Sequence, residues 1–282
     1  MLVVTLMWSI AGVVTRHLDS AQSFEVTFWR SSFTALALGG YYAVAHGRDT
    51  PRILAAGGWP LWMSGLMWSV MFTCFMVALT LTTVANVLIT MSLGPLFTAL
   101  LAHFMLGHPV KPRTWAAIVV AGAGIAWMYG HNVSGDPAHL IGTLVALGVP
   151  IAGAINWNIL QRSGARVDLV PALLIGAIVS SAVTLPLAMP WQATPHDIGW
   201  LAALGVFQLA IPCMLSVRLA RWLPAPEISL LALLEIVFGI AWAWLGANEQ
   251  PAPQVLAGGT LVIATLAVNA LASRTTIDQG MT

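Results

Sequence analysis

Residues 58–80 read GWPLWMSGLMWSVMFTCFMVALT, a long apolar run without a charged side chain. A helix needs about 20 apolar residues to cross the hydrocarbon core of a bilayer, which is about 30 Å thick. This run therefore predicts a transmembrane helix, in which every backbone polar group is bonded inside the segment. Strands of a membrane β-barrel would instead alternate apolar and polar residues over segments of about ten residues.

The same pattern recurs along the whole chain and predicts ten membrane spans joined by short connections. The expected spans are 1–17, 23–45, 58–80, 84–107, 113–130, 140–162, 168–189, 197–220, 225–246 and 253–272. The composition agrees, because 59% of the 282 residues are hydrophobic and only 7% are charged, whereas soluble domains carry about 25% charged residues. The expected fold class is an all-α integral membrane bundle. Cys74 and Cys213 fall inside spans, where we expect reduced apolar side chains rather than a disulfide.

The basic residues predict how the bundle is oriented. Insertion leaves Lys and Arg on the cytoplasmic side. With ten spans, nine of the 11 basic residues fall on one side: Arg48, Arg52, Lys111, Arg113, Arg162, Arg166, Arg218, Arg221 and Arg274. Arg16 falls on the opposite side and Arg30 inside a span. We therefore expect both termini in the cytoplasm and, for a bacterial chain, a location in the inner (plasma) membrane. No basic segment precedes the first span, so no cleaved signal peptide is expected.

An internal repeat divides the chain into halves. LGPLF at residues 93–97 aligns without a gap to LEIVF at residues 234–238, an offset of 141 in a chain of 282 residues. Five spans in each half is an odd number, so the two halves must enter the membrane in opposite directions. We therefore expect one membrane domain built from two inverted five-helix repeats, residues 1–135 and 136–282. Inverted repeats are typical of transporters that work by alternating access.

Several short motifs resemble those of EamA-type transporters, which belong to the drug/metabolite transporter superfamily. The matching stretches are SLGPLFTALLA at 92–102, LG at 106–107, PRTW at 112–115, LLEIVF at 233–238 followed by Glu249 and Pro253, and FWR at 28–30. The resemblance implies ten helices in two inverted halves, a central substrate cavity and transport of small metabolites. It extends to the YddG-like group of amino-acid exporters. Two positions depart from the pattern: Ile236 replaces the usual proline, and His108 replaces the usual glutamate.

Ionisable side chains inside the expected spans are the first candidates for substrate binding, because such groups are expensive in lipid and usually face a cavity or a partner. Glu235 lies near the middle of the ninth span. It is a candidate for contact with a substrate ammonium group or for a protonatable switch, and a packing role stays open. Arg30 is a candidate for binding a substrate carboxylate. It is equally suited to pair with Glu25 or to extend to the outer headgroups.

Aromatic and amide side chains at mid-depth complete the candidate site. Trp157 and, on the expected symmetry-related first span, Trp8 are candidate stacking surfaces for an apolar or aromatic solute; lipid contact or packing is the alternative. Asn156, beside Trp157, is a candidate for substrate contact or for bridging two helices. Gln208 in the eighth span and Asn86 near the outer start of the fourth are further candidates.

These features predict a secondary transporter of small organic metabolites, most consistent with export of aromatic or apolar amino acids. The expected mechanism is alternating access through a mid-membrane cavity formed largely by the first, third, fourth, sixth, eighth and ninth spans. Few buried charges favour zwitterions over phosphorylated substrates, which need several basic residues. The expected partners are a small-molecule substrate and membrane lipid. Nucleic acid is disfavoured by a net charge of +1, and a monomer is sufficient.

No cofactor, metal site, nucleotide-binding loop or enzyme motif is expected. Two alternatives stay open at this point. The first is a proton-coupled multidrug effluxer in which Glu235 carries the proton. The second is a membrane-embedded enzyme that modifies lipid. The residues that come nearest to a catalytic cluster for such an enzyme are His131, Asp136 and His139, in the outer loop after the fifth span.

Overall fold

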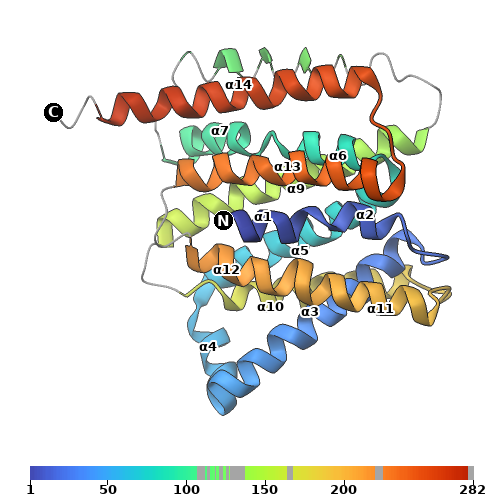
Figure 1. Ribbon diagram of the computed structural model, residues 1–282. Coiled ribbons are helices and arrows are strands. Elements are labelled where there is room, and N and C mark those ends of the chain that lie inside the picture. Colours follow the sequence, from blue (N-terminus) through green and yellow to red (C-terminus); the bar gives the residue numbers. More distant parts are fainter. Residues whose placement is uncertain are drawn as a thin grey trace.

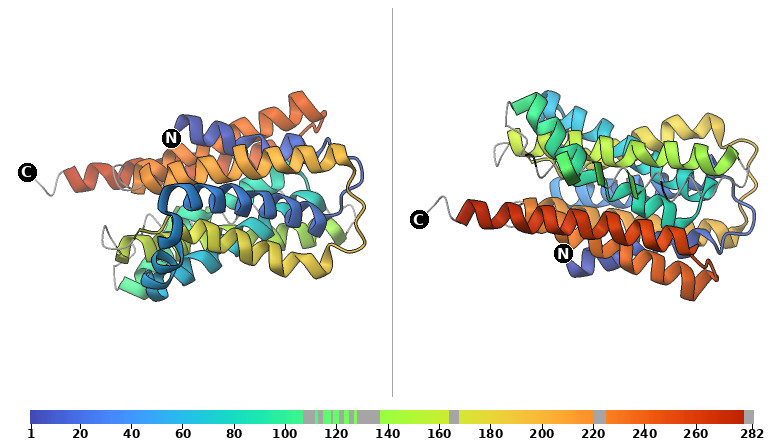
Figure 2. Two further views of the ribbon diagram at one scale, coloured as in Figure 1. Left: turned by 90° about the horizontal axis from the view of Figure 1, so that it is seen from below. Right: turned by 90° about the horizontal axis from the view of Figure 1, so that it is seen from above.

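The computed structural model describes residues 1–106, 112, 115–117, 119–120, 123–124, 127, 137–163, 168–219 and 225–278, and these residues contain helices and no strand. In Figure 1 most helices run side by side in roughly one direction, and α3 crosses them obliquely. The N-terminus of α1 and the C-terminal end of α14 point toward the same end of the bundle. Figure 2 shows that the C-terminal end of α14 extends beyond the other helices.

The elements follow one another in the order of the expected spans. The first part of the chain forms α1 (Leu2–Ser9), α2 (Ala11–Thr15), α3 (Ser23–His46), α4 (Thr50–Ala56), α5 (Gly58–Leu81), α6 (Val84–Met91) and α7 (Gly94–Leu106). The second part forms α9 (Pro137–Ser163), α10 (Pro171–Thr184), α11 (Pro195–Ala203), the π-helix η4 (Leu204–Ala210), α12 (Ile211–Leu219), α13 (Ala225–Ala247) and α14 (Pro253–Asp278). Short 3₁₀ turns, η1 (Gly47–Asp49) and η3 (Leu185–Leu187), follow α3 and α10. The expected span 113–130 lies mostly outside the described residues.

Helix lengths distinguish two groups of apolar segments in the described part of the chain. Three are long and apolar enough to cross a membrane by themselves: Gly58–Leu81, Ala138–Leu160 and Pro195–Leu219. Shorter apolar helices occupy Leu2–Thr15, Val84–Thr98, Pro171–Leu187, Leu234–Ala247 and Pro253–Thr265. All-helical secondary structure and apolar composition make this an integral membrane fold, while the total of ten spans stays a prediction.

Within the described residues, three of the expected spans are interrupted in their interior, and the sequence analysis did not predict this. The first span is divided at Ile10 into α1 and α2. The fourth is divided at Ser92 and Leu93, just before Pro95, a residue that has no backbone N–H to donate. The eighth changes to π-helix over Leu204–Ala210. Interrupted and π-helical turns inside transmembrane helices are typical of functional sites.

Small and hydroxylated residues allow the central helices to pack closely. α5 contacts α3, α9 and α10. A Cβ atom placed on Gly65 would lie 2.6 Å from Ile175 Cγ2, so α5 and α10 approach each other at this glycine. Ser31 and Ser180 share a buried hydrogen bond of 2.9 Å between α3 and α10, and Thr73 of α5 bonds the same serine hydroxyl at 2.9 Å. Small residues and hydroxyl bonds of this kind hold helices together in lipid.

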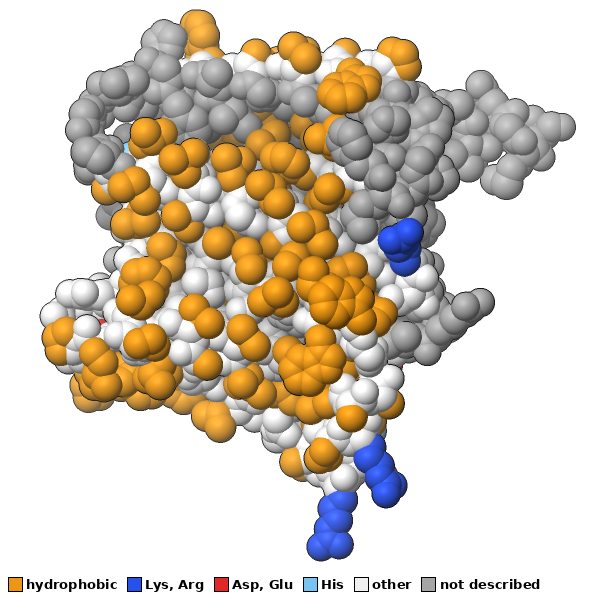
Figure 3. Space-filling view, turned by 180° about the vertical axis from the view of Figure 1, so that it is seen from behind, with side chains coloured by type: hydrophobic (Ala, Val, Ile, Leu, Met, Phe, Trp, Pro, Cys, Tyr) orange, Lys and Arg blue, Asp and Glu red, His pale blue; other side chains and the backbone are white. Residues whose placement is uncertain are grey.

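The outer surface of the bundle is apolar along most of its length. Large exposed hydrophobic side chains include Leu36, Val44, Trp59, Ile178 and Leu245. Figure 3 shows hydrophobic side chains across the whole face, with the Lys and Arg side chains at one end. Exposed Arg48, Arg52, Arg162 and Arg218 follow or end α3, α9 and α12. An apolar surface of this extent is suited to contact lipid tails.

Candidate functional site

A cavity of about 230 Å³ lies inside the bundle. Its wall is formed by side chains from α1, α3, α5, α6, α7, α9, η4, α12 and α13. The wall is mostly apolar and includes five aromatic residues: Trp8, Trp68, Phe72, Phe75 and Trp157. Two of the helix interruptions contribute lining residues, Ser92 and Gln208, and Trp8 lines the cavity two residues before the interruption at Ile10. The cavity is therefore built where the backbone departs from a regular α-helix.

Arg30 of α3 lines the cavity, and its side chain is buried, with only 1% exposed. Its guanidinium carbon lies 5.6 Å from the centre of the Phe75 ring, a cation–π contact. Among the described residues, its Nε and Nη1 atoms have no hydrogen-bond partner. The alternatives of pairing with Glu25 and of reaching the headgroups are not realised. The Glu25 carboxylate accepts bonds of 2.9–3.1 Å from the backbone N–H groups of Gln192 and Ala193.

The backbone at Arg30 is held against the π-helix. Thr34 Oγ1 is 2.9 Å from both the Arg30 carbonyl oxygen and the Gly205 carbonyl oxygen. A Cβ on Gly205 would lie 2.7 Å from the Arg30 oxygen, so only glycine permits this approach. Residue 205 belongs to the same π-helix as Gln208, and this packing therefore positions both polar side chains at the cavity.

Gln208 is 2% exposed, and its Nε2 donates to the Trp8 carbonyl oxygen at 3.1 Å. Because that partner is an acceptor, the amide nitrogen must face it, and Oε1 is left on the other side. Oε1 has no partner among the described residues.

Glu235 of α13 is the acidic residue of the cavity wall. Its carboxylate and the Arg30 guanidinium interact electrostatically. Within the described part of the chain no direct ion pair joins them. An acid and a base thus share one apolar cavity without neutralising each other by contact, an arrangement that leaves both available to a ligand.

The model of the EamA-like transporter family matches residues 1–130 and 140–271 of this chain. The chain belongs to the EamA-like transporter family. The resemblance carried by the short motifs is thereby confirmed. As an EamA-like transporter it is a multi-pass membrane protein of bacterial type that moves small metabolites, and it is not an enzyme.

Two curated relatives and a solved structure are similar over most of their length. The S-adenosylmethionine uptake transporter of Rickettsia conorii (strain ATCC VR-613 / Malish 7) is 25% identical over 261 residues, 91% of this chain and 86% of that protein. The pseudopaline exporter CntI of Pseudomonas aeruginosa (strain UCBPP-PA14) is 25% identical over 251 residues, 85% of this chain and 83% of that protein. One crystal structure superimposes with a TM-score of 0.67 at 19% identity, covering 97% of this chain and 96% of that one, which shows the fold.

Within this EamA-like transporter, five of the seven candidate residues line the cavity: Trp8, Arg30, Trp157, Gln208 and Glu235. The other two lie elsewhere. Asn156 Oδ1 accepts a bond of 2.6 Å from Ser64 Oγ, so it links α9 to α5, the bridging role left open above. Asn86 lies at the start of α6, where its Nδ2 donates to Thr82 Oγ1 at 3.1 Å.

One helix face was missed in the sequence analysis. Trp68, Met71, Phe72 and Phe75 of α5 all line the cavity. Their spacing of three and four residues places them on one side of a helix, and this periodicity was the available signal. It was hidden because α5 is apolar on every side.

The polar residues of the connections around Asp19 and His139 do not form a second site within the described residues. Asp19, His196 and Asp197 bring ligand atoms within 4.8 Å of one another. The Asp197 carboxylate, however, already accepts bonds of 2.7–3.2 Å from the backbone N–H groups of Asp19, Ser20 and Thr194. His131 and Asp136 lie outside the described residues, and His139 Nδ1 is 3.1 Å from Thr82 Oγ1.

Proposed function

We propose that this EamA-like transporter is a secondary transporter of zwitterionic amino acids with aromatic or apolar side chains, and that it works as an exporter by alternating access. One observation carries the proposal. Among the described residues that line it, the cavity presents one base, Arg30, and one acid, Glu235, in a wall that is otherwise mostly aromatic and aliphatic. A zwitterion brings one charge of each sign and so compensates both groups.

Charge balance argues against the other solute classes. A phosphorylated metabolite carries about two negative charges, and Arg30 is the base among the described lining residues. A lipophilic cation would add a second positive charge against the single Glu235 carboxylate of the described lining residues, and a net charge in an apolar cavity is costly. The aromatic side chains offer stacking surfaces for an apolar or aromatic substituent.

The two relatives support an amino-acid-like substrate, but they do not agree on the direction of transport. One is named for uptake of S-adenosylmethionine, which contains an α-amino acid group, and the other for export of pseudopaline. Export is our proposal for this chain from the motif resemblance. We further propose ten spans in two inverted halves, 1–135 and 136–282, in the inner membrane with both termini cytoplasmic. The matches of the family model to 1–130 and to 140–271, and the exposed arginines at one end, support this arrangement.

Transport by reconstituted proteoliposomes tests the proposal. The labelled panel contains L-tryptophan, L-leucine, L-glutamate, L-lysine, S-adenosylmethionine and tetraphenylphosphonium, each with and without a pH gradient. We expect saturable movement of tryptophan and leucine without a gradient. Protein-free liposomes provide the control. Movement of tetraphenylphosphonium alone, and only with a gradient, would replace the proposal by the multidrug alternative.

A further inference from the structure

Three buried side chains of the cavity wall have polar atoms without hydrogen-bond partners among the described residues. The atoms are Arg30 Nε and Nη1, Trp68 Nε1, and Gln208 Oε1. All three side chains are at most 4% exposed. About 90% or more of buried polar groups in proteins are hydrogen-bonded, and leaving one unpaired is destabilising. Of the six described residues with such atoms, three line this one cavity, and Trp29, Asn86 and Asn158 lie elsewhere. A ligand in the cavity would supply partners to the three that line it.

The unpaired atoms fall into two groups by their hydrogen-bonding chemistry. Arg30 on α3 and Trp68 on α5 offer donors only, since a guanidinium and an indole N–H have no acceptor. Gln208 on η4 offers a free carbonyl oxygen, and Glu235 on α13 adds a carboxylate at the same cavity. One group of side chains therefore requires an acceptor from the ligand, and the other requires a donor.

We propose that this cavity binds the α-amino acid group of its substrate in one orientation, with the carboxylate on Arg30 and Trp68 and the ammonium on Gln208 and Glu235. This inference rests on the proposed function and assigns each part of the substrate to its own side chains. An amine without a carboxylate leaves the Arg30 and Trp68 donors unpaired. A carboxylic acid without an ammonium leaves the two acceptors unpaired.

The rest of the cavity wall is the place where the side chain of the amino acid would bind. Phe72 and Met71 line the cavity and carry no N–H or O–H group, and Trp157 lines it beside them. They form an apolar surface that accepts an aromatic or aliphatic side chain, and the indole of Trp157 offers a stacking plane. The polar ends of the substrate and its apolar substituent thus meet different parts of one cavity.

Ligand analogues that lack one charge test this orientation. The probes are L-tryptophan, tryptamine without the carboxylate, and indole-3-propionate without the ammonium, each measured as an inhibitor of labelled tryptophan uptake. Wild-type protein is expected to prefer tryptophan to both analogues. Arg30→Gln is expected to reduce the preference for tryptophan over tryptamine about tenfold, which corresponds to about 1.4 kcal/mol. The preference for tryptophan over indole-3-propionate should stay unchanged in this variant. Glu235→Gln is expected to do the reverse.

Two conservative substitutions on α5 provide a second test in case Arg30→Gln does not fold. Trp68→Phe retains an aromatic ring and removes only the N–H donor, and we expect it to reduce the preference over tryptamine. Trp62→Phe is the matched control, because Trp62 is 51% exposed on the same helix and does not line the cavity. This control is expected to behave as wild type.

The outcomes separate this inference from the proposed function. If wild-type protein moves no amino acid, the proposed function fails. If it moves tryptophan but the variants weaken all three ligands equally, the orientation is wrong and the polar residues serve only the fold. Opposite changes of the two preferences in Arg30→Gln and Glu235→Gln support the orientation.

Discussion

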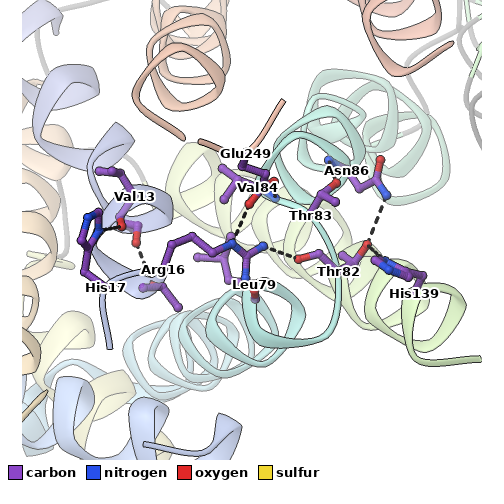
Figure 4. A network of polar contacts seen from close by, with 12 residues as sticks. Val13, Arg16, His17, Leu79, Thr82, Thr83, Val84, Asn86, His139 and Glu249 are labelled. Atoms are coloured by element: carbon purple, nitrogen blue, oxygen red, sulfur yellow. Dashed lines mark hydrogen bonds and ion pairs between the residues drawn. The ribbon is translucent and has the colours of Figure 1, made fainter. Parts of the chain in front are cut away.

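Arg16 Nε lies 2.6 Å from Glu249 Oε2, although 233 positions separate the two residues in the sequence. Figure 4 shows that the Arg16 side chain also reaches the connection between α5 and α6. Its Nη1 and Nη2 donate to the carbonyl oxygens of Leu79 at 2.8 Å and Thr82 at 2.7 Å. Glu249 Oε1 in turn accepts a bond of 2.6 Å from the backbone N–H of Val84. One ion pair therefore ties together α2, the α5–α6 connection and the residues after α13.

We expect both Arg16→Gln and Glu249→Gln to lower the free energy of unfolding by about 2 kcal/mol. Hydrogen bonds to charged groups contribute about 1.5–3 kcal/mol each, and the partial exposure of the two side chains, 27% and 17%, reduces that value. The charge-swapped pair Arg16→Glu with Glu249→Arg is expected to remain destabilised, because the introduced carboxylate would face the carbonyl oxygens of Leu79 and Thr82. Unfolding in mixed micelles measures all three variants. Full recovery in the swapped pair would show that the ion pair alone matters.

Gly205→Ala is expected to destabilise the protein by about 1–3 kcal/mol, the usual cost of overpacking. The added methyl would lie 2.7 Å from the Arg30 carbonyl oxygen and 2.8 Å from Phe33 Cβ. Since Arg30 and Gln208 flank this contact, the Michaelis constant for tryptophan should rise as well. Gly199→Ala is the matched control, because a Cβ there meets nothing within 4 Å. That variant should gain up to about 1 kcal/mol from helix propensity. Equal behaviour of the two variants would contradict the tight packing of α3 on η4.

The native cysteines report whether substrate occupies the cavity. Cys213 lines it, whereas Cys74 does not. Saturating L-tryptophan is expected to slow alkylation of Cys213 by N-ethylmaleimide about tenfold at about ten times the dissociation constant, by mass action. Peptide mapping by mass spectrometry follows both thiols in one sample, so Cys74 is an internal control whose rate should stay constant. Equal slowing of both thiols would indicate a global change instead of occupancy.

Asn156 is expected to support the fold and not substrate binding. Asn156→Ala should cost about 0.6–2 kcal/mol, the range for interhelical polar contacts in lipid, and should leave the Michaelis constant unchanged. A double-mutant cycle with Ser64→Ala measures the coupling across the bond of 2.6 Å between the two side chains. Additive effects of the two substitutions, or a higher Michaelis constant for tryptophan, would assign Asn156 a different role.

Glu235→Gln distinguishes a binding carboxylate from a proton carrier. If Glu235 binds the substrate ammonium, the variant should lose affinity about tenfold, equally in exchange and in gradient-driven transport, as expected for a hydrogen bond to a charged group. A proton carrier predicts a different result, in which gradient-driven efflux is abolished and exchange is intact. Parallel assays of exchange and of gradient-driven movement of tryptophan decide between them.

Much of the helical architecture and the charged and amide residues of the cavity wall were predictable. Apolar runs predicted helices because lipid offers no partner to backbone groups, and the described helices follow those runs. Arg30, Glu235 and Gln208 were noticed because polar groups are rare in apolar spans, and all three line the cavity. Asn156 met the same criterion, yet it accepts a hydrogen bond from Ser64. The sequence did not reveal this, because it does not show which neighbouring helix a polar side chain faces.

The sequence by itself determined that this chain is a membrane-embedded helical bundle. Hydrophobicity, the placement of charges and the residues that begin or end helices can all be read from neighbouring positions in the chain. Tertiary structure alone decided the packing of the π-helix around Gln208 on α3 and the meeting of Arg16 with Glu249. Each depends on contacts between segments far apart in the chain. Such contacts decide which buried polar groups pair within the protein and which stay free in the cavity for a ligand.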